Sequence, residues 1–242
     1  MEKSILHKAA TRGHANHGWL EAYHTFSFAG YQDPSRMNFG VLRVLNDDTI
    51  SGGMGFGKHP HDNMEIITIP LEGALEHEDS MGNKAVIRKG EIQVMSAGTG
   101  VFHSEYNPSE TERTKLLQIW VFPNKRNVEP RYDQISLNEA DRHNQLQQIL
   151  SPNAEDEGVW IHQDAWFHLG KFDENFKVGY DFKKSGNGVY AFVLNGKFEI
   201  NGQELDQRDG FGISGTEKIS ITALTNDAEI LLMEVPMFIN FK

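Results

Sequence analysis

Two short stretches combine metal-ligating residue types at a spacing that can bring them to one face. One residue separates His59 from His61, and one residue separates His103 from Glu105. Successive side chains of a β-strand point to opposite faces, so residues i and i+2 project to the same side. If two such strands face each other, three imidazoles and one carboxylate converge on one point. This set suits Fe, Mn, Co, Ni, Cu or Zn rather than Ca or Mg.

Ordinary structural roles for these residues must be weighed against metal binding. A lone buried histidine usually packs in a core, and His59-Pro60-His61 could be the exposed end of a strand. Both pairs, however, have strand parity and lie in one strand-rich region. The chain has no cysteine, so a thiolate-rich structural zinc site is excluded. The pattern therefore favours an open metal site with nitrogen and oxygen ligands. His14, His17 and His24 share no strand or helix face, and we expect surface or hydrogen-bonding roles for them.

Composition narrows the classes of partner. The 242 residues include 23 Lys+Arg and 34 Asp+Glu, a formal net charge of −11, which argues against direct nucleic-acid binding. No run approaches the roughly 20 apolar residues of a membrane span. The first residues lack the apolar core and cleavage site of a signal peptide, so we expect no membrane association and a cytoplasmic setting.

Short strands and turns dominate the chain. Residues 39–45 read as a strand, and residues 52–122 alternate between strands and turns. A second strand series begins near residue 186 and contains Asn195-Gly196 and Asn201-Gly202, which are strong hairpin signals. The pattern predicts an all-β sandwich or barrel. We predict one helix, over residues 138–150.

The second strand series resembles a degenerate copy of the first. Residues 69–73 parallel 192–196 at an offset of 123, and residues 90–98 parallel 208–215 at an offset near 118. These offsets place Phe182, Lys184, Ile221 and Ala223 where the first half has His59, His61, His103 and Glu105. No histidine lies within two residues of those positions, so we expect metal in the first half only. His162 and His168, which lie upstream, are expected at an interface or in loops.

The segments around the metal pattern are similar to the two sequence motifs of the cupin superfamily, and the chain most resembles the pirin family. The matching segments cover residues 17 to about 133 densely, and they are His24–Phe28, Leu42–Asp48, His59–Glu65, Leu71–Gly73 through Asn83, Met95–Glu105 and Leu117–Trp120. The resemblance implies an all-β bicupin, in which two antiparallel β-barrels pack face to face, with a few short helices. It also implies an N-terminal metal-binding cupin domain at residues 1–133 and a C-terminal domain without metal at 134–242.

The resemblance implies that His59, His61, His103 and Glu105 hold one divalent metal. Fe(II) is favoured, with Mn, Co, Ni, Cu or Zn as alternatives. In many other cupins the carboxylate ligand comes from the first motif, which here is Glu65. Glu65 has the same strand parity as His61, so parity leaves both carboxylates open. Following the family, we expect Glu65 beside the metal rather than on it, where carboxylates commonly orient histidine ligands.

Bacterial relatives implied by the resemblance are quercetinases, which open the central ring of a flavonol such as quercetin with O2 and release carbon monoxide. Glu105, or Glu65, could then accept the proton of the flavonol 3-hydroxyl as a catalytic base. Candidate substrate contacts, each of which could equally be a core residue, are Phe39, Met54, Phe56, Met95 and Phe102. One alternative is a metal- or redox-dependent regulatory protein that binds a transcription factor or a metabolic enzyme. Another is a non-catalytic sensor of small aromatic ligands. The chain could be a monomer or a homodimer.

Overall fold

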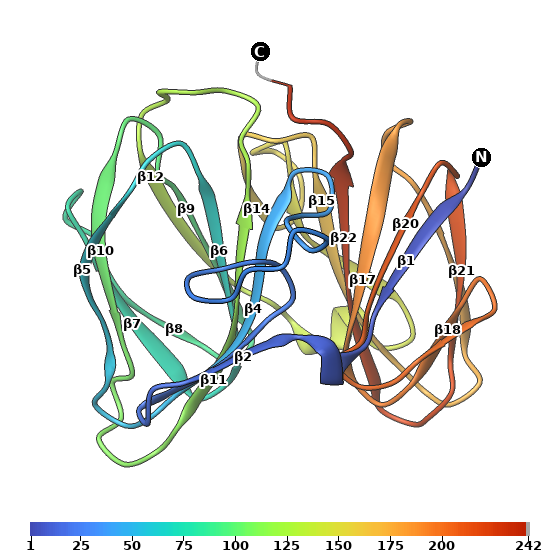
Figure 1. Ribbon diagram of the computed structural model, residues 1–242, viewed down its shortest axis with the longest axis horizontal. Helices are drawn as coiled ribbons and strands as arrows, with labels where there is room; N and C mark the ends of the chain where they lie inside the picture. Colours follow the sequence, from blue (N-terminus) through green and yellow to red (C-terminus); the bar gives the residue numbers. More distant parts are fainter. Residues whose placement is uncertain (241–242) are drawn as a thin grey trace.

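The computed structural model describes residues 1–240, and strands make up nearly all of its regular structure (Figure 1). The helical elements of this part of the chain are two short 3-10 turns, η1 (Ala9–Thr11) and η2 (Glu139–Arg142). The predicted all-β class is confirmed. None of the described helices is long and apolar enough to cross a membrane.

The N-terminal barrel consists of a seven-stranded and a four-stranded sheet. The seven-stranded sheet has the order β12-β9-β6-β11-β4-β3-β2. Its strands are β12 (Arg131–Ser136), β9 (Glu91–Ser96), β6 (Glu65–Glu72), β11 (Thr114–Val121), β4 (Leu42–Ile50), β3 (Leu20–His24) and β2 (Gly13–Asn16). The opposing sheet consists of β5 (Gly55–His61), β10 (Val101–Tyr106), β7 (Ala74–Asp79) and β8 (Lys84–Arg88).

The C-terminal barrel likewise consists of a seven-stranded and a four-stranded sheet. Its seven-stranded sheet has the order β1-β20-β17-β22-β15-β13-β14. These strands are β1 (Lys3–His7), β20 (Gly210–Ser214), β17 (Asn187–Asn195), β22 (Ala228–Pro236), β15 (Trp166–Phe172), β13 (Leu146–Ser151) and β14 (Val159–Trp160). Its four-stranded sheet consists of β16 (Lys177–Asp181), β21 (Lys218–Ala223), β18 (Phe198–Ile200) and β19 (Gln203–Leu205).

The two seven-stranded sheets face each other at the centre of the molecule, and the four-stranded sheets lie on the outside (Figure 1). One apolar cluster joins side chains of both domains, including Leu42 and Ile119 from the first and Phe167 and Leu231 from the second. All four are at most 1% exposed. Burial of this shared core holds the domains together as a single unit.

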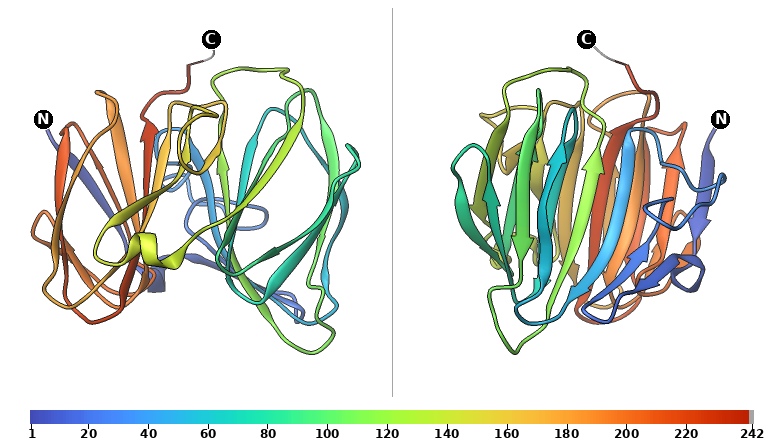
Figure 2. Two further views of the ribbon diagram at one scale, coloured as in Figure 1. Left: turned by 180° about the vertical axis from the view of Figure 1, so that it is seen from behind. Right: turned by 60° about the vertical axis from the view of Figure 1, so that its left-hand side comes forward.

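The chain ends do not follow a simple division at residue 133. Strand β1 pairs antiparallel with β20, so Lys3–His7 belongs to the sheet of the C-terminal barrel. Figure 1 shows this blue strand beside the orange ones. Strand β12 stays in the N-terminal sheet as far as Ser136. The chain then crosses between the barrels through the yellow-green segment that holds η2 (Figure 2).

The prediction of a helix over residues 138–150 is wrong. Only Glu139–Arg142 forms a 3-10 turn, and Leu146–Ser151 forms strand β13. Asn144 adopts a positive φ of 55°, which interrupts any helix. The following residues pair with β15, and Ile149 and Leu150 are fully buried. Tertiary pairing and burial therefore outweigh the weak helix propensity of this stretch.

Candidate metal centre

Three histidines converge inside the N-terminal barrel, as strand parity predicts. Strands β5 and β10 are antiparallel neighbours, with His103 opposite His59 and Val101 opposite His61. The ring centroids of His59, His61 and His103 are 4.4 to 4.8 Å apart. One ring nitrogen from each lies within 4.8 Å of the others, a spacing that suits ligands of one ion.

The protonation of these rings suits metal binding. The Nδ1 atom of His59 lies 2.7 Å from the Gly57 carbonyl, so it carries the proton and leaves Nε2 as a free ligand atom. Burial, together with the charges of the neighbouring histidines, lowers the pKa of His61 to about 4 and that of His103 to about 2. Neutral imidazole is the form that binds a metal. The Nε2 atom of His103 is buried without a hydrogen-bond partner, as a metal-ligand atom would be without its ion.

Glu105 lies beside the three histidines and is positioned from the opposite sheet. Its carboxylate, on a residue that is 2% exposed, accepts a hydrogen bond of 2.9 Å from Gln118 Nε2. The Oε1 atom of Gln118 in turn accepts a hydrogen bond of 3.3 Å from Trp120 Nε1. Burial raises the pKa of Glu105. A register shift follows His103, so Glu105 pairs with Phe56 and not with Gly57.

A second ligand group shares His103 and contains a histidine that the sequence reasoning missed. Ligand atoms of His77, His103 and Glu105 lie within 4.8 Å of one another, and all three residues are buried. His77 also lies 3.3 Å from the carboxylate of Asp79. His77 and Asp79 again stand at i and i+2 on one strand, so the rule applied to the first two pairs could have found them. Glu105 therefore shares a ligand group with His103 but not with His59 or His61.

Glu65 belongs to neither ligand group, although it is 1% exposed. Its carboxylate accepts a hydrogen bond of 2.6 Å from Ser96 Oγ. Burial raises the pKa of Glu65 to about 7, while the Ser96 hydroxyl and the Arg131 charge oppose that shift. Its parity matches that of His61, but its strand β6 belongs to the other sheet.

The five aromatic and methionine candidates occupy several environments. Phe39 packs between the domains, with its ring 5.4 Å from that of Tyr190, and Met95 is fully buried. Met54 and Phe102 are 41% and 49% exposed. Phe56 is half-buried opposite Glu105. A role in substrate binding stays a prediction for all five.

An aromatic-lined cavity of about 720 Å³ lies along β2 and β3, between these strands and Phe56. Trp19, Phe28 and Tyr31 also line it. It adjoins the metal centre, because Phe28 packs 5.3 Å from Trp120 and Trp120 packs 5.0 Å from His61. Its volume is in the range of small-molecule sites, roughly 300–1,000 Å³.

The other histidines that the sequence analysis considered lie outside both ligand groups. His24 lines the same cavity but is bonded to Asn46 Oδ1 at 2.9 Å, and the exposed His14 lies 3.3 Å from Glu21. His162 follows β14. His168 is buried on β15 with its ring 5.0 Å from that of Tyr180, inside the C-terminal barrel, so the expected interface or loop position is wrong for His168.

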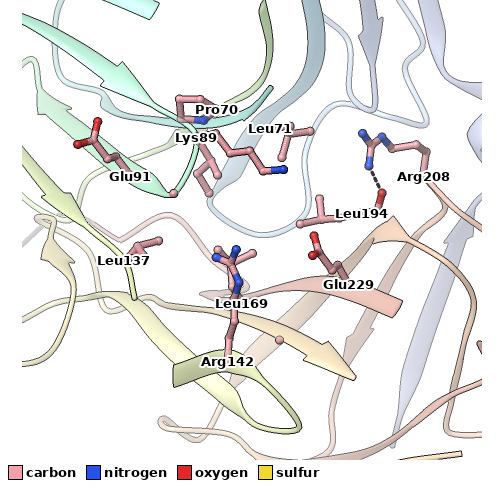
Figure 3. A pocket seen from close by; sticks show the side chains of 13 residues that line it. Pro70, Leu71, Lys89, Glu91, Leu137, Arg142, Leu169, Leu194, Arg208 and Glu229 are labelled. Carbon is pink, nitrogen blue, oxygen red and sulfur yellow. Dashed lines mark hydrogen bonds between the residues drawn. The ribbon is translucent and has the colours of Figure 1, made fainter. Parts of the chain in front are cut away.

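A separate cavity of about 160 Å³ lies at the junction of the two barrels (Figure 3). Lys89 reaches into it from the N-terminal barrel, and Arg142 of η2 and Glu229 of β22 reach into it from the opposite side. Arg208 at its rim donates hydrogen bonds to the Leu194 carbonyl and the Asp47 carboxylate. None of the metal-ligand candidates lines this cavity. It is a feature of the domain contact and not of the metal centre.

Comparison with known proteins agrees with this architecture. The Pirin family matches residues 6–121, and the Quercetinase C-terminal cupin domain matches residues 148–235. A protein of Escherichia coli K12 named quercetin 2,3-dioxygenase is 47% identical over 235 residues, which cover 96% of this chain and 98% of that protein. The chain belongs to the pirin family. A pirin-like protein of Caulobacter vibrioides is 41% identical over 223 residues, 92% of this chain and 95% of its own.

Among solved structures, the bacterial pirin YhhW of Escherichia coli in complex with nickel(II) superimposes on this pirin-family chain with a TM-score of 0.91. The identity is 45%, and the match covers 97% of this chain and 99% of the other. The predicted bicupin fold is confirmed by these matches. The N-terminal barrel thus contains a possible His/Glu metal site in a family with a metal-bound member.

Proposed function

We propose that this protein is a metal-dependent dioxygenase that opens the central ring of a flavonol such as quercetin with O2 and releases carbon monoxide. The observation that carries the proposal is the convergence of His59, His61 and His103, with Glu105 beside them, next to an aromatic-lined cavity. The identity of 47% with a protein named quercetin 2,3-dioxygenase supplies the reaction class.

His59, His61, His103 and Glu105 would hold the metal, which when bound supplies a Lewis acid and open coordination positions for small ligands. The protein contributes the surroundings. Gln118 orients the Glu105 carboxylate through its hydrogen bond. Phe28, Trp19 and Phe56 offer flat apolar surfaces on which fused aromatic rings can stack. The buried barrel interior excludes water from a reactive site.

Glu105 is the preferred base for the flavonol 3-hydroxyl proton. Its burial raises its pKa, which strengthens it as a proton acceptor near neutral pH. Glu65 is the second choice, because its carboxylate is bonded to Ser96 and it belongs to neither ligand group. The metal remains Fe(II) by preference. Nickel, which is bound in the related bacterial pirin, ranks next, and Mn, Co, Cu and Zn stay possible.

The test is reconstitution of metal-free protein with Fe(II), Mn, Co, Ni and Cu, followed by quercetin absorbance under air. The expected result is loss of quercetin absorbance and formation of carbon monoxide with at least one metal. The double variant His59→Ala, His61→Ala should lose both bound metal and turnover. Unchanged absorbance with every metal would exclude flavonols as substrates.

A regulatory role has one observation in its favour. Phe102 and Tyr106 are 49% and 41% exposed on the same face of β10, next to the strand that holds His59 and His61. Such exposed aromatic side chains are typical of protein-binding surfaces. Tyr106→Ser would test it, since this role predicts weaker binding of a metal-state-dependent partner protein with unchanged quercetin turnover.

A further inference from the structure

A buried hydrogen-bonded chain runs behind His103, from His77 to Asp79. The Nδ1 atoms of His77 and His103 are 3.4 Å apart, and His77 Nε2 is 3.3 Å from Asp79 Oδ2. The side chains of His77 and Asp79 are both 0% exposed. Strand pairing places them there, because β7 lies beside β10 with Asp79 opposite His103 and His77 opposite Glu105.

The far end of the chain is fixed by the turn after β7. Asp79 Oδ1 accepts hydrogen bonds from the backbone N–H groups of Met81 at 2.9 Å and Asn83 at 3.1 Å. Asn83 Nδ2 donates to Oδ2 at 2.8 Å. A carboxylate with these donors acts only as an acceptor. At the contact between His77 and Asp79, the proton is therefore on His77 Nε2.

This assignment determines the tautomers along the whole chain. A neutral imidazole has one proton, so His77 with its proton on Nε2 offers Nδ1 as an acceptor. The proton in the contact between His77 and His103 must then be on His103 Nδ1. The Nε2 atom of His103 keeps its lone pair, and it is the buried atom without a partner.

We propose that His77 and Asp79 are positioning residues, which hold the His103 ring with its Nε2 lone pair directed at the metal. The inference rests on the metal site of the proposed function. Carboxylates that orient ligating histidines are common, and their loss weakens metal binding by about tenfold to a hundredfold. Here the Asp79 carboxylate acts on His103 indirectly, through the imidazole of His77.

The same residues allow a different role for His77, as a metal ligand with His103 and Glu105. The two roles differ in the number of imidazoles on the metal. A positioning role leaves three, from His59, His61 and His103, whether or not His77 is present. X-ray absorption of the nickel-loaded protein counts them.

Two substitutions at His77 separate hydrogen bonding from packing. His77→Asn places an amide oxygen near the position of Nδ1, so the acceptor for His103 is kept. His77→Phe keeps a ring against Tyr132, which lies 4.9 Å from the His77 ring, but removes the acceptor. Calorimetric titration of metal-free protein with Ni(II) should show affinity lowered by about tenfold to a hundredfold in His77→Phe. His77→Asn should bind markedly more tightly than His77→Phe.

Asp79→Asn completes a double-mutant cycle. It should weaken Ni(II) binding in the wild-type background and have no further effect in His77→Phe, because Asp79 acts only through His77. Circular dichroism of each metal-free variant checks that the fold is retained. Additive losses, equal losses in the two His77 variants, or unchanged affinity in His77→Phe would each overturn the proposal. So would one imidazole fewer in His77→Phe. Retention of metal by the His59→Ala, His61→Ala variant would instead refute the metal site itself, whatever the His77 variants show.

Discussion

Glu65 provides a quantitative test of the barrel interior, because its carboxyl group is buried and accepts hydrogen bonds from the Ser96 hydroxyl and the His162 backbone. Glu65 is 1% exposed, and burial raises the pKa of its carboxyl group from 4.5 to about 7. A carboxyl whose pKa is raised on folding binds its proton more tightly in the folded state. Its stabilising contribution is therefore complete below pH 4.5 and is lost as the pH rises through 7.

The magnitude follows from the difference between the two pKa values. Each unit corresponds to about 1.4 kcal/mol. Between pH 5 and pH 8 the ionisation of Glu65 should lower the free energy of unfolding by about 2 to 3 kcal/mol. Glu65→Gln cannot ionise and keeps an oxygen that can accept the hydrogen bond from Ser96, so this part of the pH dependence should disappear.

Urea denaturation of metal-free protein, followed by tryptophan fluorescence at pH 5 and pH 8, measures this difference. The exposed Glu110→Gln is the matched control and should follow wild type. Equal pH dependence in wild type and Glu65→Gln would refute the reasoning. The same variant also tests the open question of the carboxylate ligand. We expect Glu65→Gln to keep its metal, and loss of metal would place Glu65 in the coordination sphere.

Three further perturbations test the fold and the contact between the domains. Burial lowers the pKa of His168 to about 4. The contribution of the neutral ring to stability is therefore present above pH 6.5 and is lost as the pH falls through 4. In acid denaturation, His168→Phe should retain about 3 kcal/mol of unfolding free energy that wild type loses. Asp47 forms ion pairs with Arg12 at 3.1 Å and with Arg208 of the other domain at 2.9 Å. Asp47→Asn should lower the free energy of unfolding in chemical denaturation by about 2 kcal/mol. A change near zero would show that this contact does not stabilise the domain contact. Gly98 has a φ of +49°, and a Cβ there would lie 2.1 Å from the Val128 carbonyl oxygen; Gly98→Ala should therefore cost about 3 kcal/mol or more. Gly90→Ala, at a φ of +86° with open space, should cost only about 1 kcal/mol, and thermal denaturation of the two glycine variants measures the difference.

The candidate metal centre could be predicted from sequence to the extent that it depends on strand parity, which is a local property. His59, His61 and His103 meet because i and i+2 share a face and their strands are neighbours. Parity compares faces only within one sheet. It could not separate Glu65 from Glu105, because Glu65 lies on a strand of the opposite sheet.

Features that depend on distant pairing could not be predicted. Nothing local to Lys3–His7 indicates that it pairs with Gly210–Ser214, some two hundred residues later. The strand Leu146–Ser151 reads as a helix until its partner β15 is known. Phe39, placed among pocket candidates by residue type, packs between the domains because the domain contact assembles around it.

The duplicated fold can be aligned more accurately from the structure than from sequence offsets. Gly73 and Gly196 are equivalent, because a Cβ on either would meet a threonine hydroxyl, of Thr114 and Thr225 respectively. The N–H group of the next residue donates to that same hydroxyl in both halves. When the alignment is extended from these two glycines along the paired strands, each C-terminal equivalent lies two residues earlier than the sequence offsets predicted.

The structural equivalents of His59, His61, His103 and Glu105 are then Tyr180, Phe182, Ile219 and Ile221. These side chains belong to, or pack against, the apolar cluster that fills the C-terminal barrel. The equivalent of His77 is Ile200, which is also in that cluster. The four proposed ligands and His77 are thus all replaced by apolar or aromatic residues in the C-terminal half. At these five positions the C-terminal barrel has apolar or aromatic side chains that stabilise it through burial, whereas the N-terminal barrel has buried polar groups that are costly unless they are bonded or bind an ion. Because this cost falls on His77 as well as on the four proposed ligands, the difference between the barrels supports the proposal that these residues act together at a metal.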